Sequence, residues 1–100
     1  MPAAVNLLDI TKTRLRLKSD AFDDELTMHI DTGKTRLILA GINPDIVEAA
    51  DDQIIVNTLS AFACSQFGID NPESGRFFRI FNSFMTVLSL CEEYKEQKSG

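Results

Sequence analysis

The residue types that most often carry enzyme chemistry are sparse in this chain of 100 residues. His29 is the only histidine, and no cysteine, serine or second histidine stands at a motif spacing from it, which predicts a partly exposed structural histidine. Cys64 and Cys91 have no CxxC spacing and no neighbouring histidine, so we expect reduced thiols packed as small apolar side chains. There is also no glycine-rich phosphate loop and no pair of carboxylates in an apolar context. The sequence therefore predicts a protein that is not an enzyme, with no catalytic residues and no cofactor.

Charged residues give two candidate binding features. The acidic run SDAFDDE lacks the D-x-D-x-D-G spacing and the twelfth-position glutamate of a calcium loop, so we expect no metal site. Basic residues gather in one segment, at Lys12, Arg14, Arg16 and Lys18. They suit the C-terminal end of a helix dipole, and a phosphate-binding or partner-binding patch is the alternative interpretation. The net charge of −5 argues against a protein that binds nucleic acid by neutralising phosphates.

Two helices are expected in the first half of the chain. Asn6 is a capping residue with Asp9 three positions on, which predicts a helix from Leu7 to about Leu17. An acidic first turn at residues 23–25 opens a second helix, which Gly41 ends in a left-handed conformation. Its buried face is expected to hold five residues, with the glycine allowing close approach of another helix: Leu26, Ile30, Gly33, Leu37 and Ala40.

Residues 42–50 read as a connection in which a short helical turn could follow Asn43-Pro44. Asp51 or Asp52 can then cap a third long helix over residues 53–67. This helix is apolar almost all round, which predicts that it is buried, and Gly68 ends it.

The most strongly patterned segment is residues 71–90, where Asn71 can cap a helix whose first residue is Pro72. One apolar face recurs at helical spacing, at Phe77, Phe81, Phe84 and Leu88. Additional apolar stripes, which include Phe78 and Met85, make the surface wider than one small core needs. We therefore expect either a central helix or a helix with one core face and one subunit or partner interface, with Phe78 and Met85 at that interface.

After Leu90 the chain becomes charged, and residues 91–100 are predicted to form a mobile tail. Either Tyr94 contacts a partner or the tail is an ordinary frayed end. The rest predicts an all-α fold, a small bundle of about four helices with short loops in one domain over residues 1–90. No segment has the length of a membrane span or the pattern of a secretion signal, so we expect an intracellular protein with no membrane partner.

The order of these segments resembles a known family. A capped helix ends in RLRL, an acidic helix start follows, and then come LAGI, FGIDNPESGRF, FNSF and LSL. Over residues 5–90 this resembles the head–tail connector proteins of long-tailed bacteriophages, also called adaptor or head-completion proteins. The most specific part is F-G-x-D-N-P-[DE]-x-x-R-F, intact from Phe67 to Phe77 and including Asn71, Pro72 and Arg76. Gly75 departs from the pattern, because such sequences more often have a helix former there.

The resemblance implies a structural virion protein at the head–tail interface, made in the cytoplasm of the host bacterium. It implies a homo-oligomeric ring, dodecameric in the virion, that docks beneath the phage portal protein and extends the DNA tunnel. A tail-side connector or stopper protein would bind its other side, and DNA would pass through without tight binding.

Two other classes of protein remain open from the residues alone. One is a small helical regulatory or protein-binding module that dimerises through the last helix. The other is a DNA-binding helix-turn-helix protein that uses Arg14, Arg16 and Lys18, which the acidic total disfavours.

Overall fold

The computed structural model describes residues 6–68 and 71–95, and this part of the chain is helical with short connections. Its helices are, in chain order, α1 (Leu7–Leu15), α2 (Asp23–Leu39), α3 (Pro44–Ala49), α4 (Gln53–Gln66), α5 (Ser74–Leu90) and the short 3₁₀ helix η1 (Glu92–Tyr94). The predicted all-α fold is confirmed. The helix beyond the expected four is α3, which lies in the connection where a short helical turn could follow Asn43-Pro44.

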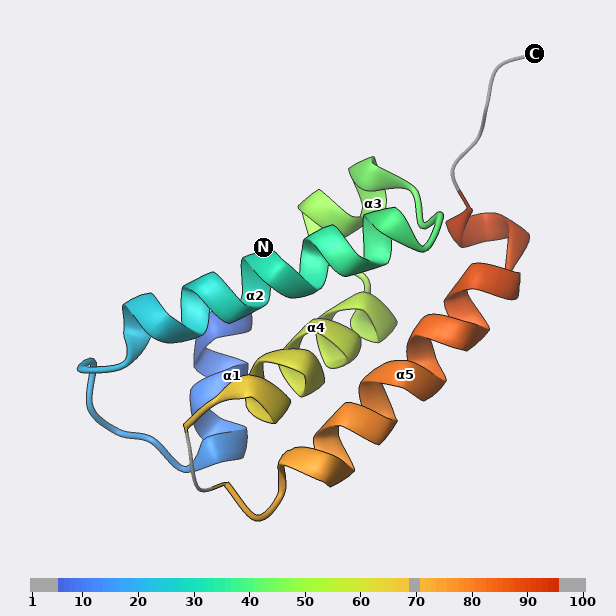
Figure 1. The fold of residues 1–100 in the computed structure, drawn as a ribbon. Helices are drawn as coiled ribbons and strands as arrows, with labels where there is room; N and C mark the ends of the chain where they lie inside the picture. The colour runs from blue at the N-terminus through green and yellow to red at the C-terminus, as the bar shows by residue number, and fades with distance from the viewer. Residues whose placement is uncertain (1–5, 69–70, 96–100) are drawn as a thin grey trace.

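Helix α4 is the centre of the bundle, and α1, α2 and α5 all pack on it (Figure 1). The hairpin of α4 and α5 is antiparallel, so α4 begins near the point where α5 ends. Helices α3 and η1 lie there, at what we call the η1 end. The opposite end, which we call the Asn71 end, is formed by the last residues of α1 and by the loop between α4 and α5.

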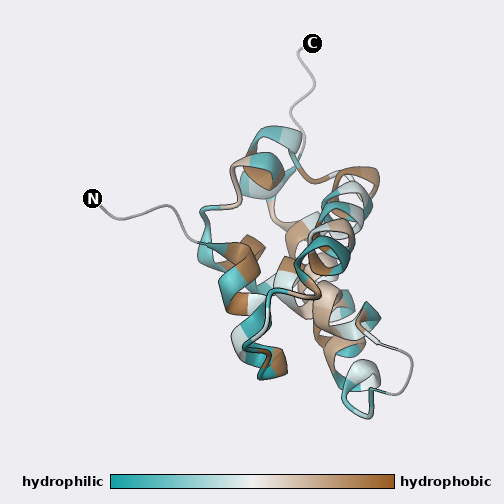
Figure 2. Cartoon of the chain, turned by 90° about the vertical axis from the view of Figure 1, so that its left-hand side faces the viewer, coloured by the Kyte–Doolittle hydropathy of each residue, from teal (hydrophilic) through white to brown (hydrophobic). Residues whose placement is uncertain are grey.

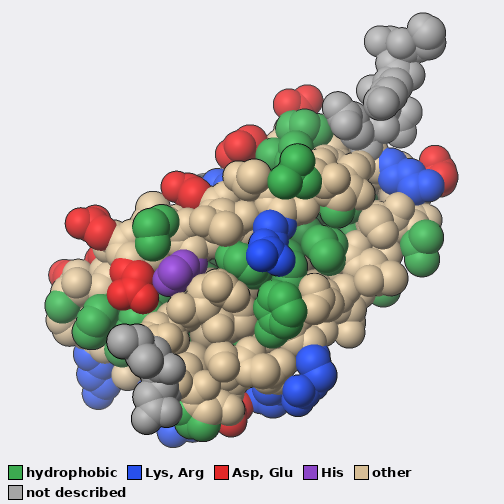
Figure 3. Space-filling model, in the orientation of Figure 1, with side chains coloured by type: hydrophobic (Ala, Val, Ile, Leu, Met, Phe, Trp, Pro, Cys, Tyr) green, Lys and Arg blue, Asp and Glu red, His purple; other side chains and the backbone are tan. Residues whose placement is uncertain are grey.

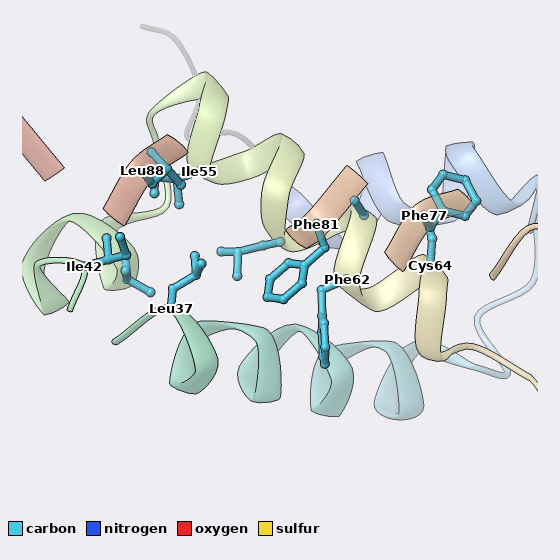
Figure 4. Close-up of a cluster of buried hydrophobic side chains, with 11 residues drawn as sticks. Leu37, Ile42, Ile55, Phe62, Cys64, Phe77, Phe81 and Leu88 are labelled. Carbon is cyan, nitrogen blue, oxygen red and sulfur yellow. The ribbon is translucent and has the colours of Figure 1, made fainter. Parts of the chain in front are cut away.

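The core is formed by apolar side chains from all of the long helices. Phe62 of α4 and Phe81 of α5 lie together, with their ring centroids 4.8 Å apart (Figure 4). As predicted, α4 is buried on nearly every side. Apolar residues face inward between the helices and polar residues cover the outside, as Figure 2 shows. Such one-sided patterning is what folds a short chain around a single core.

Gly33 is the point of closest approach between α2 and α4, as expected. A Cβ atom placed on Gly33 would stand 3.0 Å from Cδ2 of Phe62 and 3.2 Å from Cδ2 of Leu59. The other predicted residues of this face are also buried, except Ala40. Ala40 is exposed because α2 ends at Leu39, and the chain then turns through Gly41 at a φ of 97°.

The helix starts agree with the predicted caps. Oδ1 of Asn6 accepts a hydrogen bond from the backbone N–H of Asp9 at 3.1 Å, and Oδ1 of Asp52 accepts one from Ile54 at 2.8 Å. Helix α1, however, ends at Leu15 rather than at Leu17. Arg16 adopts a left-handed φ of 61°, which brings the N–H of Leu17 to the carbonyl of Lys12 and closes the helix.

Helix α5 begins at Ser74, so the prediction that Pro72 is its first residue is wrong. Asn71 and Pro72 instead form a turn, in which the N–H of Ser74 donates to the Asn71 carbonyl at 3.1 Å. Phe84 also differs from the expected core face, because it is half-buried whereas Phe77, Phe81 and Leu88 are buried.

The polar segment after α5 does not leave the bundle at Cys91. Residues 92–94 form η1, and the N–H of Asn43 donates to the carbonyl of Tyr94 at 2.7 Å. An isolated antiparallel bridge joins Ile42 to Lys95. Contacts with the bundle therefore continue beyond Leu90 to Lys95. Tyr94 supplies an apolar body and a polar tip that the charge count of the segment does not reveal. Residues 96–100 of the expected tail lie outside the described residues.

Candidate interaction surface

A hollow of about 480 Å³ opens at the Asn71 end, between the last turn of α1 and the start of α5. It is lined by Arg14, Leu15, Arg16, Asn71, Pro72, Glu73, Arg76 and Phe77. Four of these, Asn71, Pro72, Arg76 and Phe77, belong to the sequence pattern that carried the family resemblance. The fold thus places that pattern beside two residues of the basic segment, which lie more than 50 positions earlier in the chain.

Asn71 fixes the geometry of this loop from both sides. Its Oδ1 accepts from the N–H of Glu73 at 3.0 Å, which is the turn that precedes α5. Its Nδ2 donates to the carbonyls of Cys64 at 2.9 Å and Phe67 at 3.2 Å. Those carbonyls belong to the last turn of α4 and to its C-cap residue, where backbone acceptors have no partner within the helix. The sequence predicted a cap for α5, whereas the side chain joins the end of one helix to the approach of the next.

Phe77 lines the hollow, and two guanidinium groups lie over its ring. The Cζ atom of Arg76 is 4.9 Å from the centre of the Phe77 ring, and that of Arg14 is 5.4 Å away. Arg76 also donates from Nε to Oε1 of Glu73 at 2.7 Å. Attraction between a cation and the face of an aromatic ring holds both arginines near the opening of the hollow.

Arg14 connects this surface to the core helix. Its Nη1 donates to Oγ of the buried Ser60, and the same nitrogen lies 3.4 Å from the carbonyl oxygen of Asn57. Both acceptors are on α4, so the guanidinium holds α1 against α4. Arg14 is therefore a structural part of the site, whereas Arg16 is exposed beside it.

A second hollow, of about 410 Å³, continues along α5 from the first and shares Arg76 with it. Its lining is Arg76, Arg79, Ile80, Ser83 and Phe84. Together the two hollows form a surface that we call the arginine surface, with Arg14, Arg16, Arg76 and Arg79 at its edges and apolar side chains below. Basic side chains lie over the first half of α5 in Figure 3, whereas acidic ones lie along the upper edge, over α2 and α3. Arg79 was not singled out from the sequence, although its spacing of three from Arg76 was a signal that both lie on one side of the helix.

The remaining members of the basic segment serve other contacts. Nζ of Lys12 lies 2.7 Å from Oδ1 of Asp20 and 2.9 Å from Oδ1 of Asp23, so it joins α1 to the start of α2. Lys18 is exposed. The segment is therefore divided between a helix junction and the arginine surface instead of forming one patch.

Phe78 and Met85 lie on α5 away from the arginine surface. Both are half-buried and pack against the core cluster, and the Phe78 ring lies roughly parallel to that of Phe81, with centroids 6.3 Å apart. A role for them at a subunit interface stays a prediction. The apolar residues of α5 that are most exposed are Val87 at 59 % and Leu90 at 74 %, toward the η1 end.

Tyr94 lies at the η1 end and contacts its own chain. Its hydroxyl donates to Oδ2 of Asp52 at 2.7 Å, across 42 positions of sequence. This hydrogen bond raises the pKa of Tyr94 to about 12 and lowers the pKa of Asp52. Asp52 thereby caps α4 with one oxygen and holds η1 with the other.

A hollow of about 380 Å³ lies beside this contact and is bordered largely by carboxylates. Its lining is Asp45, Ile46, Ala49, Asp51, Asp52, Glu93 and Tyr94. Asp45, Asp51 and Glu93 are exposed, and among residues 6–68 and 71–95 none of the three takes part in an ion pair. The molecule thus has a basic surface at one end and an acidic one at the other.

The remaining candidate residues from the sequence have structural surroundings. Nε2 of His29 lies 3.3 Å from Oε2 of Glu25 one turn away on α2. Cys64 is buried, and burial raises the pKa of its thiol to about 11, while Cys91 is half-exposed.

Within the described part of the chain no cluster of histidine, cysteine and carboxylate side chains could hold a metal ion. None of its helices is both long and apolar enough to cross a membrane. The arginine surface and the acidic hollow each combine charged and apolar side chains, and both could bind another molecule through these two kinds of contact.

Comparison with known families gives this surface a context. A family model described as phage connector protein matches residues 7–95, which includes all the helices from α1 to η1. The chain belongs to the phage connector protein family. No curated protein and no solved structure matches it. As a phage connector it has a structural role among the proteins of the phage head and tail. The arginine surface and the acidic η1 end are the two parts of this connector that are best suited to such binding.

Proposed function

We propose that this connector assembles as a ring beneath the portal protein, extends the DNA tunnel and presents the surface on which the tail docks. The single observation that carries the proposal is the family match over residues 7–95. The described residues add a helical bundle with a basic surface at one end and an acidic surface at the other.

Ring formation requires heterologous contacts, in which one patch of a subunit meets a different patch of its neighbour. A subunit whose two ends carry unlike surfaces meets this requirement, whereas a symmetric dimer would need one self-complementary patch. Unlike surfaces at the two ends are compatible with a ring, and the family resemblance is the reason that we propose a closed homo-oligomer, dodecameric in the virion.

Passage of DNA through such a ring requires weak attraction between wall and duplex. The net charge of −5 disfavours tight binding, because carboxylates facing phosphates release no counterions. Of the three cations that the helix-turn-helix alternative would use, Arg14 is bound to α4, whereas Arg16 and Lys18 are exposed. We expect a dissociation constant for duplex DNA no tighter than about 10⁻⁴ M at physiological salt.

The proposal is tested by joining tails to heads in vitro. DNA-filled heads that carry the portal protein but lack this chain are mixed with tails and the tail-side proteins, with and without the purified protein. Tailed particles counted by electron microscopy should form only when the protein is added, and it should then be found between portal and tail. Equal joining in its absence would refute the proposed function.

A further inference from the structure

Two surfaces at opposite ends of the molecule have opposite charge, and each combines charged side chains with apolar ones. The arginine surface has a cationic edge above Phe77, Ile80 and Phe84. The η1 end has exposed carboxylates at Asp45, Asp51 and Glu93 around Ile46, Ala49 and Tyr94. We propose that the arginine surface of one subunit binds the acidic edge formed by α3 and η1 on a second copy of this chain.

The charge of the whole chain makes the arginine surface unusual. Only one carboxylate, Glu73, lies among its lining residues, and that carboxylate is already paired with Arg76 at 2.7 Å. In a protein with 15 acidic and 10 basic residues, four arginines gathered around aromatic rings indicate a site for an anionic partner. Guanidinium groups recognise carboxylates in paired, planar geometry, and this favours an acidic protein edge as the occupant.

The acidic edge has the complementary properties. Its three exposed carboxylates have no cationic partner among the described residues, so their charge is available to a neighbour. The hydrogen bond between Tyr94 and Asp52 holds η1 in place, and the edge is therefore formed before binding. A preformed edge avoids most of the ordering entropy that a loose segment would lose on binding.

The positions of the two surfaces determine what they can build. They lie at opposite ends of the α4–α5 hairpin, so the contact is head-to-tail and uses a different patch on each copy (Figure 1). Head-to-tail contacts of this kind extend into rings or filaments. The inference rests on the proposed ring for its closure, whereas the contact itself is a pairwise property of the chain.

Two complementary variants test the contact. One carries Arg16→Asp and Arg79→Glu and keeps the acidic edge. Aspartate is chosen at position 16 because it tolerates the left-handed φ of 61° found there. The other carries Asp51→Lys and Glu93→Lys and keeps the arginine surface. All four side chains are exposed, and Arg14 and Asp52 are left intact because they hold helices together.

Sedimentation velocity at millimolar concentration is expected to show that each variant alone is monomeric. An equimolar mixture should give a 1:1 dimer that binds at least tenfold more tightly than either variant binds itself. Raising the salt from 50 to 500 mM should weaken the dimer, since exposed charges are screened. Circular dichroism of each variant checks that the fold is retained. A third variant with the neutral changes Arg16→Asn and Arg79→Gln keeps the acidic edge, and it should self-associate more weakly than the unchanged protein.

A mixture that stays monomeric, or a variant that dimerises with itself, overturns the proposed contact. Loss of DNA binding in the Arg16→Asp, Arg79→Glu variant together with a monomeric mixture would instead assign the arginine surface to nucleic acid. These outcomes are separate from those of the head-joining experiment. A mixed dimer without tail joining would refute the function and leave the contact standing, and tail joining with a monomeric mixture would do the reverse.

Discussion

Asp52 is the residue on which two distant segments of this connector depend. One carboxylate oxygen caps α4 and the other accepts a hydrogen bond from the hydroxyl of Tyr94. The cap could be predicted, because an aspartate directly before an apolar helix is a local signal. The contact with Tyr94 could not, because it joins residues 42 positions apart and depends on how α5 returns along α4.

The hydroxyl of Tyr94 is expected to ionise about two pH units later than an ordinary tyrosine. Its pKa is raised to about 12 from 10.0, mainly by the hydrogen bond to Asp52. Tyr94 is the only tyrosine and there is no tryptophan, so ultraviolet absorbance during alkaline titration reports this residue alone. In the Asp52→Asn variant the α4 cap is kept, since asparagine is also a good cap, and the pKa should fall toward 10. A midpoint near 10 in the unchanged protein would show that the hydrogen bond is absent in solution.

The same contact determines how stability at the η1 end depends on pH. Because the pKa of Tyr94 is raised on folding, its contribution is complete below pH 10 and is lost as the pH rises through about 12. The pKa of Asp52 is lowered on folding, so its contribution is present above its ordinary value of 3.8 and is lost as the pH falls below that value. The Tyr94→Phe variant has no hydroxyl to titrate, so the fall in its melting temperature between pH 10 and about 12 should be smaller than in the unchanged protein.

At the scale of helices, the long elements could be predicted and their exact ends could not. Helical periodicity and caps gave α1, α2, α4 and α5 with the correct buried faces in most positions. The start of α5 was placed two residues early because Asn71 has two roles: its amide nitrogen is engaged by the carbonyls of Cys64 and Phe67. A local sequence pattern describes one helix, whereas the Asn71 side chain forms hydrogen bonds with the end of α4 and with the turn before α5.

Two helical glycines are expected to respond in opposite directions to alanine. Gly33→Ala places a Cβ 3.0 Å from the Phe62 ring and should destabilise the fold by about 1 to 3 kcal/mol, the usual cost of overpacking. Gly75→Ala meets only Arg79 at 3.7 Å, and the better helix former should stabilise α5 by up to about 1 kcal/mol. Urea unfolding followed by circular dichroism measures both. Equal effects at the two positions would contradict the close approach of α2 to α4.

The candidate site was only partly accessible from sequence. The family pattern pointed to Asn71, Pro72, Arg76 and Phe77, and all four line the hollow at the Asn71 end. Their meeting with Arg14 and Arg16 depends on how α1 packs against α4, which no spacing within either segment reveals. The acidic edge was missed for the same reason, because its residues come from α3, the start of α4 and η1.

At the scale of the whole molecule, the contacts of residues 92–95 with the bundle suggest a truncation experiment that tests where the domain ends. A chain that ends at Leu90 loses the hydrogen bonds of Tyr94 to Asp52 and Asn43 and the cover over Ile42, which is fully buried. We expect its free energy of unfolding to be lower than that of the full chain by about 1 to 3 kcal/mol, which is comparable to the cost of exposing one aliphatic side chain. A chain that ends at Lys95 keeps these contacts and serves as the matched control. Equal free energies of unfolding in urea for the two truncated chains would show that the domain ends at Leu90.

The burial of Cys64 has a practical consequence for counting subunits. With a pKa of about 11, roughly one Cys64 thiol in a thousand is ionised at pH 8, and the thiolate is the reactive form. Cys91 is half-exposed at the junction of α5 and η1. A maleimide dye should therefore attach at one position per folded chain, and mass spectrometry of the labelled protein would confirm a single adduct at Cys91. Stepwise photobleaching of particles that carry the dye would then count the copies of this connector in each one.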